Sequence, residues 1–365
     1  MKRSEFEIFN LILNKAVARR LLPSAFCLLL SAFFLAPAAH AGAWAKQKSG
    51  TMAWLHAVFF VDARRGWAAG GKGVLLKTSD GGERWEAAPA PTTDALRDIF
   101  FTDERTGWLV CDRGIYSLKV GEESRSYLMK TSDGGATWSR VDVTGADAEA
   151  RLVGVRFADA RRGWAFGELG ALYMTGDGGA TWARQRVPTK RLLLGAAFHD
   201  AARGWLVGAG ATLLHTEDGG ENWREGLALG LDAQPRERLR TVSQAPTHDG
   251  RARPPLRFNA VSFAGARRGW AVGAGGAVFA TDDGGRTWRA QNSNVEADLF
   301  DVKFLDEREG WAVGASGTIL RTADGGATWA QEPARTPHTL ERLFFTDARR
   351  GWAVGFGGTI VAFKG

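Results

Sequence analysis

Six aspartates recur in one short motif, Thr-x-Asp-Gly-Gly-x-x-Trp, which we call the box. They are Asp80, Asp133, Asp177, Asp218, Asp283 and Asp324. A carboxylate can act as a general acid, a nucleophile or a metal ligand, or it can bond the backbone of a tight turn. Here two glycines, which tolerate positive φ angles, directly follow each aspartate. Because this setting recurs six times, we interpret the box aspartates as turn-formers rather than catalytic acids.

Arginines form a second recurrent set, in short segments that end at a Gly-Trp pair. The candidates for binding a partner are Arg64, Arg65, Arg161, Arg162, Arg203, Arg267, Arg268, Arg349 and Arg350, and Arg105 and Arg308 hold similar places. Arginine can bind an acidic segment or an exposed carboxylate in bidentate fashion. The alternative is a set of solvated turns, which we favour slightly because aspartates in the same segments offset the charge. Those aspartates are Asp62, Asp103, Asp159, Asp200, Asp306 and Asp347.

A third set of polar residues does not recur. Its members replace small or apolar residues at equivalent places in other repeats, and they are His56, Arg97, Asp98, Arg156, Asp301, Lys303, Glu341 and Arg342. If the repeats surround a central opening, these side chains could form a polar funnel for a small anion, a sugar or a chain terminus. The alternative is that they only face water in a channel.

The elements that must position these residues are defined by tryptophan spacing. Seven tryptophans each follow a glycine, and they are Trp67, Trp108, Trp164, Trp205, Trp270, Trp311 and Trp352. Six of them are followed by a box, and an undisturbed unit spans 41 residues. A period of about 40 to 45 residues with glycine-rich turns indicates four-stranded blades of a β-propeller. We therefore expect an all-β fold of seven antiparallel blades.

The chain ends predict how the ring closes. The seventh repeat stops where its box would begin, and Trp44 precedes Trp67 by 23 residues, the usual distance from a box tryptophan to the next Gly-Trp. Trp44 therefore holds the box position of the last blade. We expect residues 42–49 to pair beside residues 358–364, which would also protect open strand edges.

Strand order predicts which parts share a face. In the first repeat we expect strands at 55–61, 67–70, 74–78 and from residue 85, with the first strand innermost. Since antiparallel strands alternate direction, the arginine-rich turn between the first and second strands lies on the same face as the box. The inner strands begin on the opposite face, together with the polar set that includes His56 and Arg97.

Two long insertions are expected on that opposite face. One lies near 119–127, between the second and third strands of its blade, and the other spans about 226–251. Loops on a rigid scaffold often carry binding residues, and the second insertion is polar, basic and proline-containing, as expected of an arm that orders on a partner. The alternative is that both are tolerated surface insertions.

Residues 1–41 have the layout of an export signal. A basic region with Lys2, Arg3, Lys15, Arg19 and Arg20 precedes the apolar stretch 21–36 and then Ala39-His40-Ala41, a small-x-small cleavage sequence. The apolar stretch is short for a membrane span. We therefore expect a periplasmic or secreted mature domain over 42–365, with no integral membrane span.

The mature composition limits other functions. Loss of five basic and two acidic residues with the signal lowers the formal net charge from +7 to +4, which does not indicate nucleic-acid binding. Cys111 is the one cysteine that remains, so it cannot form an intramolecular disulfide, and we expect it to be a small buried hydrophobe. The histidines lack metal-ligand spacing, so we expect neither a metal nor another cofactor.

The repeated boxes resemble those of the Asp-box (BNR) β-propellers. The Gly-Trp-Ala-Val-Gly segments at 269–273, 310–314 and 351–355 make the chain similar to the photosystem II stability/assembly factor family. The resemblance spans about 42–365 and implies a seven-bladed lumenal or exported propeller. It also implies an assembly chaperone for a membrane complex, without enzymatic chemistry.

A secreted glycan-binding protein or sialidase-like glycoside hydrolase is the alternative, because sialidases also use Asp-box propellers. A sialidase needs a tyrosine nucleophile near the opening, yet Tyr116, Tyr127 and Tyr173 lie elsewhere in the expected blades. Asp98 and Asp301 share an inner-strand position and could form an inverting pair, which we consider the weaker reading. We expect a monomeric, non-enzymatic interaction or assembly factor for an envelope or membrane protein.

Overall fold

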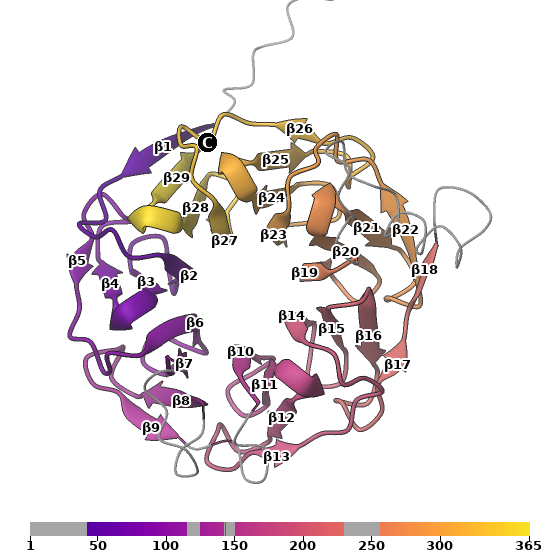
Figure 1. The fold of residues 1–365 in the computed structure, drawn as a ribbon, viewed down its shortest axis with the longest axis horizontal. Helices are drawn as coiled ribbons and strands as arrows, with labels where there is room; N and C mark the ends of the chain where they lie inside the picture. Colours follow the sequence, from indigo (N-terminus) through magenta and orange to yellow (C-terminus); the bar gives the residue numbers. More distant parts are fainter. Residues whose placement is uncertain (1–41, 115–124, 142, 144–149, 230–255) are drawn as a thin grey trace, which may run out of the picture. The chain divides into compact units, whose positions relative to one another are not determined.

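A computed structural model describes residues 42–114, 125–141, 143, 150–229 and 256–365. The expected export signal over 1–41 lies outside the described residues. Residues 43–364 form one compact unit, in which seven sheets are arranged around a common axis (Figure 1). The expectation of an all-β, seven-bladed propeller is confirmed.

The first four blades each contain four successive strands, from the inner strand near the axis to the outer strand at the rim. Blade 1 contains β2 (Leu55–Phe60), β3 (Gly66–Gly70), β4 (Leu75–Thr78) and β5 (Glu86–Ala87). Blade 2 contains β6 (Ala95–Phe101), β7 (Gly107–Asp112), β8 (Ser126–Thr131) and β9 (Ser139–Val141). Blade 3 contains β10 (Leu152–Phe157), β11 (Gly163–Gly167), β12 (Leu172–Thr175) and β13 (Ala183–Arg184). Blade 4 contains β14 (Leu193–Phe198), β15 (Gly204–Gly208), β16 (Thr212–Thr216) and β17 (Arg224–Glu225).

The last three blades follow the same plan with two additions. Blade 5 contains β19 (Phe258–Ala264), β20 (Arg268–Gly273), β21 (Val278–Thr281), β22 (Thr287–Gln291) and a fifth strand, β18 (Leu227–Leu229). Blade 6 contains β23 (Leu299–Phe304), β24 (Gly310–Gly314), β25 (Ile319–Thr322) and β26 (Ala330–Gln331). Blade 7 contains β27 (Leu340–Asp347), β28 (Arg350–Gly355), β29 (Ile360–Lys364) and β1 (Ala43–Gln47). Short 3₁₀ turns join second and third strands at η1 (Gly71–Gly73), η3 (Glu168–Gly170), η4 (Ala274–Gly276), η5 (Ala315–Gly317) and η6 (Phe356–Gly358).

Blade 7 closes the ring with strands from both ends of the described chain. β1 pairs antiparallel with β29, and Trp44 lies opposite Phe363. Trp44 is buried, at 3% exposure, and meets Phe345 edge-on with ring centroids 6.0 Å apart. This is the strand pairing that the tryptophan spacing predicts.

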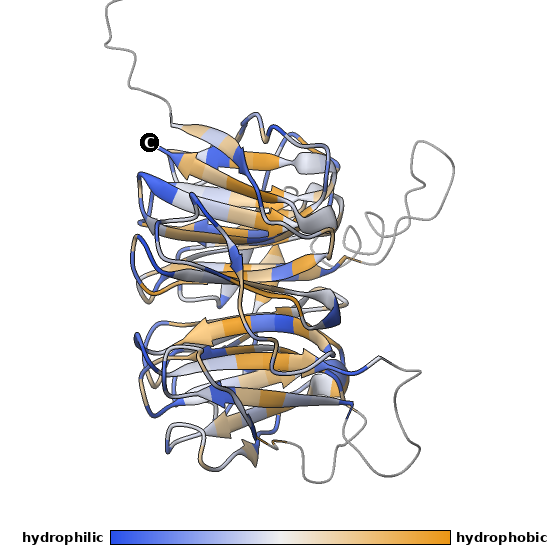
Figure 2. Ribbon diagram, turned by 90° about the vertical axis from the view of Figure 1, so that its left-hand side faces the viewer, coloured by the Kyte–Doolittle hydropathy of each residue, from blue (hydrophilic) through white to orange (hydrophobic). Residues whose placement is uncertain are grey.

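Aromatic side chains interlock neighbouring blades. The Gly-Trp indole of each blade stacks on a phenylalanine at the end of the next blade's inner strand, as Trp270 does on Phe304 with centroids 3.4 Å apart. The box tryptophan of that next blade, Trp329, meets the same ring edge-on at 5.8 Å. The contact recurs at all seven blade interfaces. Seen edge-on, apolar residues gather along the strands and hydrophilic residues at many of the turns (Figure 2).

The same phenylalanine explains the glycine before each tryptophan. A Cβ atom on Gly310 would lie 2.6 Å from the Phe304 ring, which is closer than van der Waals contact allows. The Gly-Trp pair is therefore a packing device, because the glycine makes room for one aromatic ring while the tryptophan covers the next. The tryptophans were predictable from their spacing, whereas their phenylalanine partners were not.

The box is a hydrogen-bonded turn. In blade 6, Asp324 accepts bonds from the hydroxyl of Thr322 (2.8 Å) and from the backbone N–H of Thr328 (2.9 Å). Gly325 and Gly326 have φ angles of 74° and 84°, and the N–H of Gly325 donates to the Arg308 carbonyl of the inner turn at 2.9 Å. The box and the arginine-rich turn therefore share one face, which we call the box face.

Two parts of the insertion predictions are wrong. Tyr127 belongs to β8, where it is buried and its hydroxyl donates to Asp94 at 2.7 Å, so the strand begins earlier than expected. Leu227–Leu229 is not part of an arm, because β18 pairs in parallel with β22 at the rim of blade 5. Residues 115–124 and 230–255, the remainder of the insertions, lie outside the described residues. The interval from Trp138 to Trp164 is also three residues longer than the usual 23, a departure that the sequence analysis did not note.

Candidate functional site at the channel mouth

Every inner strand carries a β-bulge near its start, where the register shifts. A bulge leaves one residue unpaired and redirects its side chain. The seven bulge residues all line one cavity of about 550 Å³ around the propeller axis, which we call the mouth. They are His56, Arg97, Val153, Leu194, Asn259, Phe300 and Glu341. The mouth is on the face opposite the boxes, since the inner strands begin there beside the ends of the second strands.

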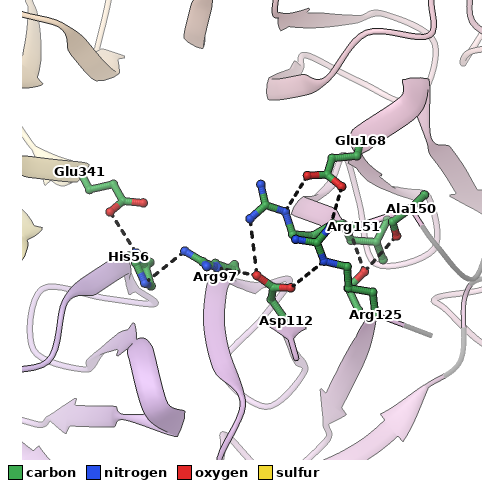
Figure 3. Close-up of polar contacts among 10 residues, drawn as sticks. His56, Arg97, Asp112, Arg125, Ala150, Arg151, Glu168 and Glu341 are labelled. Atoms are coloured by element: carbon green, nitrogen blue, oxygen red, sulfur yellow. Dashed lines mark hydrogen bonds and ion pairs between the residues drawn. The ribbon is translucent and has the colours of Figure 1, made fainter. Parts of the chain in front are cut away.

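Charged side chains at the mouth connect four consecutive blades (Figure 3). His56 Nδ1 lies 3.0 Å from Glu341 Oε2, and His56 Nε2 lies 3.4 Å from an Arg97 guanidinium nitrogen. Arginine can only donate, so Nε2 accepts and Nδ1 carries the proton that faces Glu341. Arg97 in turn donates through Nε to Asp112 at 3.1 Å. The network thereby links blades 7, 1 and 2.

The remaining contacts of the network are made around the carboxylate of Asp112. Its side chain is only 6% exposed, and nitrogens of Arg151 and Arg125 lie 3.6 Å and 3.9 Å from its oxygens. Both arginines also contact Glu168 of blade 3, at 3.1 Å and 3.3 Å. A buried carboxylate is costly unless it is paired, and here three guanidinium groups surround it.

The surface of the mouth is cationic overall. Four arginines line it, namely Arg97, Arg151, Arg257 and Arg342, against one lining carboxylate, Glu341. Arg257 is 40% exposed and pairs with Asp298 at 3.3 Å. Since Asp112 is buried behind the arginines, an anion that approaches from solvent first meets guanidinium groups.

An exposed aromatic pair borders the mouth. Trp54, the one tryptophan outside the repeat positions, lines the cavity and is 43% exposed. It meets Phe356, which is 51% exposed, edge-on with centroids 5.4 Å apart. Exposed aromatic side chains beside a charged surface are typical of interaction sites.

The remaining central-opening candidates lie deeper along the axis. Asp98, Arg156, Asp301 and Lys303 line a second cavity of about 470 Å³, and Arg342 lines both cavities. The expected polar set thus divides into two groups, with His56, Arg97 and Glu341 at the mouth and the others in the deeper chamber.

The two aspartates of the deeper chamber hold neighbouring inner strands together. Asp98 accepts a bond from the Arg156 guanidinium (2.5 Å) and from the Val155 N–H (3.0 Å) of the next blade. Asp301 likewise accepts from the Leu343 N–H of the next blade at 2.9 Å. Burial raises the pKa of Asp301, although Arg342 opposes this effect. These bonds give both carboxylates a structural role, whereas the inverting pair considered above requires them to face a substrate.

The arginines of the box face mostly contact carboxylates and carbonyls of the turns. Arg65 pairs with Asp62 (2.7 Å) and with Glu104 of the next blade (2.6 Å), and Arg203 pairs with Asp200 (2.5 Å). The Arg162 guanidinium donates to the Ala201 carbonyl at 2.7 Å. Weaker contacts join Arg268 to Glu307 (3.8 Å) and Arg267 to the Asp282 carbonyl (3.3 Å). Among the described residues, no side-chain hydrogen bond or ion pair is found for the side chains of Arg64, Arg161, Arg349 and Arg350.

The described residues show neither a metal-binding cluster nor a membrane-spanning helix. No group of three or more histidine, cysteine, aspartate or glutamate side chains in that part of the chain could hold a metal ion. No helix there has the length and hydrophobicity needed to cross a membrane. Cys111 is fully buried, and burial raises the pKa of its thiol to about 12.

Comparison with protein families identifies one that covers most of the chain. The model of the photosynthesis system II assembly factor YCF48 matches residues 87–191, 180–250 and 290–364. The chain belongs to this family. Comparison with curated proteins finds no match.

Solved YCF48 structures share the fold. YCF48 from Cyanidioschyzon merolae is 20% identical, with a TM-score of 0.66 over 88% of this chain and 98% of that one. A structure of YCF48 bound to D1 peptide is 19% identical, with the same TM-score over 88% and 97%. The GH74 xyloglucanase from Xanthomonas campestris is 16% identical, with a TM-score of 0.61 over 87% of this chain but 53% of that enzyme. At these identities the likeness establishes the fold alone.

In this YCF48-like propeller, several residues at the mouth or paired with it could not be predicted from the repeat pattern. Trp54, Arg151, Arg257 and Asp298 each stand directly before the first buried residue of an inner strand. The repeat period aligns these four positions, which lie one residue before the expected start of the inner strands. Asp112 and Arg125 flank the blade 2 insertion, where the repeat offers no equivalent position.

Proposed function

We propose that this YCF48-like protein is an exported, non-enzymatic propeller that acts as an interaction or assembly factor for an envelope or membrane protein complex. The family description supports an assembly role for a membrane complex. The layout of residues 1–41 as an export signal supports an envelope location.

The observation that carries the proposal is the cationic mouth with its aromatic border. Its arginines suit an acidic segment or a terminal carboxylate, because a guanidinium binds a carboxylate through two parallel hydrogen bonds. Trp54 and Phe356 offer a surface for an apolar side chain of the same segment. A structure of YCF48 bound to D1 peptide supports a peptide segment as the class of partner.

The test is capture from the native envelope fraction by the affinity-tagged full-length chain. Arg257→Gln removes a mouth charge, and Trp54→Ala removes the exposed indole. Arg161→Gln on the box face is the matched control, since it makes the same charge change at an exposed arginine. We expect each mouth variant to reduce recovery of the partner at least tenfold and the control to leave it unchanged.

Two other outcomes of the capture experiment would contradict the proposal. If Arg161→Gln abolishes capture and Arg257→Gln does not, the arginines of the box face form the docking surface. Recovery of no protein partner together with measurable glycan hydrolysis would favour the glycoside hydrolase instead. Export is tested by N-terminal sequencing of the protein from the periplasm or medium, with cleavage expected after Ala41.

A further inference from the structure

The inner strands place three residues of each blade along the axis. In blade 1 these are the bulge residue His56, then Ala57, then Phe59, and the pattern repeats around the ring. The third position differs in kind around the ring, and its occupants from blade 1 to blade 7 are Phe59, Phe100, Arg156, Ala197, Ser262, Lys303 and Phe344. Side chains that only filled the axis would be expected to be similar in all seven blades.

The three phenylalanines of this position lie on consecutive blades and form one aromatic wall. Phe344 of blade 7, Phe59 of blade 1 and Phe100 of blade 2 have neighbouring ring centroids 4.9 Å and 5.2 Å apart. All three rings are partly exposed to the deeper chamber of about 470 Å³. Across the chamber, Ala197 and Ser262 are small and leave space.

Cationic side chains stand at both ends of the aromatic wall. Arg156 of blade 3 is paired with Asp98 and lies over the Phe100 ring, 5.9 Å from its centroid. Lys303 of blade 6 lines the chamber with an exposed side chain, and no ion pair of its ammonium group is found among the described residues. Although water reaches this side chain, desolvation by the many protein atoms around it lowers the pKa of Lys303, while Asp301 opposes this.

The charges of the chamber favour a ligand with one negative charge. Arg156, Lys303 and Arg342 supply three positive charges, and Asp98 and Asp301 supply two negative ones when ionised. The Nε of Arg342 is buried without a hydrogen-bond partner among the described residues. An anionic group near Lys303 and Arg342, on adjacent blades, would neutralise the excess charge.

We propose that the deeper chamber binds a small organic monoanion with a flat apolar ring. The ring would stack on the wall of Phe344, Phe59 and Phe100, and the anionic group would contact Lys303. The cavity volume lies in the usual range for small-molecule sites, and its walls combine apolar rings on one side with charged and polar groups on the others. This site lies deeper along the axis than the partner surface proposed at the mouth, and Leu194, Asn259 and Arg342 line both cavities.

The test uses 3-phenylpropanoate as the probe, with binding to the purified mature protein followed by ligand-observed NMR and calorimetry. The matched probe 3-phenylpropanamide keeps the ring but lacks the charge. Lys303→Met removes the ammonium group at nearly constant length, and Lys77→Met on the exposed side of β4 is the control variant. Phe59→Leu removes the central ring of the wall and keeps an apolar side chain.

We expect the propanoate to bind at least tenfold more tightly than the amide. Lys303→Met and Phe59→Leu should each weaken binding of the propanoate at least tenfold, and Lys77→Met should not. Absence of binding at millimolar probe, equal binding of the two probes, or unchanged binding to Lys303→Met would each overturn the proposal and leave the phenylalanines as channel filling. Partner capture by Lys303→Met should match the unaltered protein, so this test and that of the proposed function fail independently.

Discussion

The box face and the mouth of this propeller use charged residues in different ways. On the box face, Arg203 and Asp200 pair within one turn at 2.5 Å, as Arg65 and Asp62 do in blade 1, and the turn aspartates of other blades accept bonds from backbone N–H groups. At the mouth, the chain of contacts from Glu341 through His56 and Arg97 to Asp112 occurs once and crosses blade boundaries. Residues that recur in every blade build the ring, whereas residues that break the repeat give one part of the ring its own chemistry.

We expect the largest effect on stability when a buried tryptophan of the repeat is compared with the exposed tryptophan at the mouth. Trp44→Ala removes a buried indole from the closing strand and should lower the free energy of unfolding by about 3–5 kcal/mol, the usual cost of a large core truncation. Trp54→Ala removes a tryptophan that is 43% exposed at the mouth, and it should change the unfolding free energy by less than about 1 kcal/mol. Denaturant unfolding followed by circular dichroism measures both. Equal losses of unfolding free energy in the two variants would show that Trp54 stabilises the fold as much as Trp44 does.

The features that could be predicted from the sequence are mainly those that recur in every blade. The period of 41 residues, the spacing of Trp44 and the boxes predicted seven blades, their closure and the two faces. The tryptophans and boxes behind these predictions repeat, so each copy supports the others. The fifth strand of blade 5 was not predicted, because Leu227–Leu229 pairs in parallel with a strand some sixty residues later.

The site was predicted only in part. His56, Arg97 and Glu341 were found because they replace small or apolar residues in aligned repeats. The contacts of these three residues were not predicted. His56 lies 3.0 Å from Glu341 because the closed ring brings together residues that are 285 positions apart in the sequence. Asp112 was missed for a related reason, because its partners come from its own blade and from blade 3.

The glycine before each tryptophan gives the next largest effect. Gly310→Ala places a methyl group where Phe304 lies 2.6 Å away, and overpacking of this kind costs about 1–3 kcal/mol. Gly176→Ala is the matched control, because a Cβ atom there meets nothing within 4 Å. The melting temperature should fall clearly for Gly310→Ala and stay nearly constant for Gly176→Ala. A neutral Gly310→Ala would mean that the Phe–Trp stack does not require the glycine.

Loss of the central carboxylate should affect the mouth more than the ring. Asp112→Asn leaves the guanidinium groups of Arg97, Arg125 and Arg151 close together without their shared counter-charge. The expected loss in unfolding free energy is about 1–2 kcal/mol, less than for a fully buried ion pair because these arginines are 25–33% exposed. Thermal unfolding measures the loss. Capture of the partner should also weaken, since Arg97 would no longer be held in place.

The smallest effect, and the one that contrasts the two regions most directly, is the response to acid. Hydrogen bonds from Thr328, first through its hydroxyl, lower the pKa of Asp324 on the box face to about 2, whereas burial raises the pKa of Asp301 in the deeper chamber. A carboxylate whose pKa is lowered on folding stabilises the protein above its unfolded pKa of about 4, and this contribution is lost as the pH falls to about 2. A carboxylate with a raised pKa has the opposite slope, since its contribution is largest at low pH and is lost as the pH rises.

Melting temperatures measured from pH 7 to pH 2 separate these slopes. The unaltered protein should lose stability between about pH 4 and pH 2, because the pKa values of Asp133 and Asp218 are also lowered to about 2. Asp324→Asn should show a smaller fall over this interval, and Asp301→Asn should not. If the melting temperature of Asp324→Asn falls as much as that of the unaltered protein, the recurrent turn does not favour the ionised aspartate. The carboxylates of the box face and of the channel would then not differ in the way that their pKa shifts indicate.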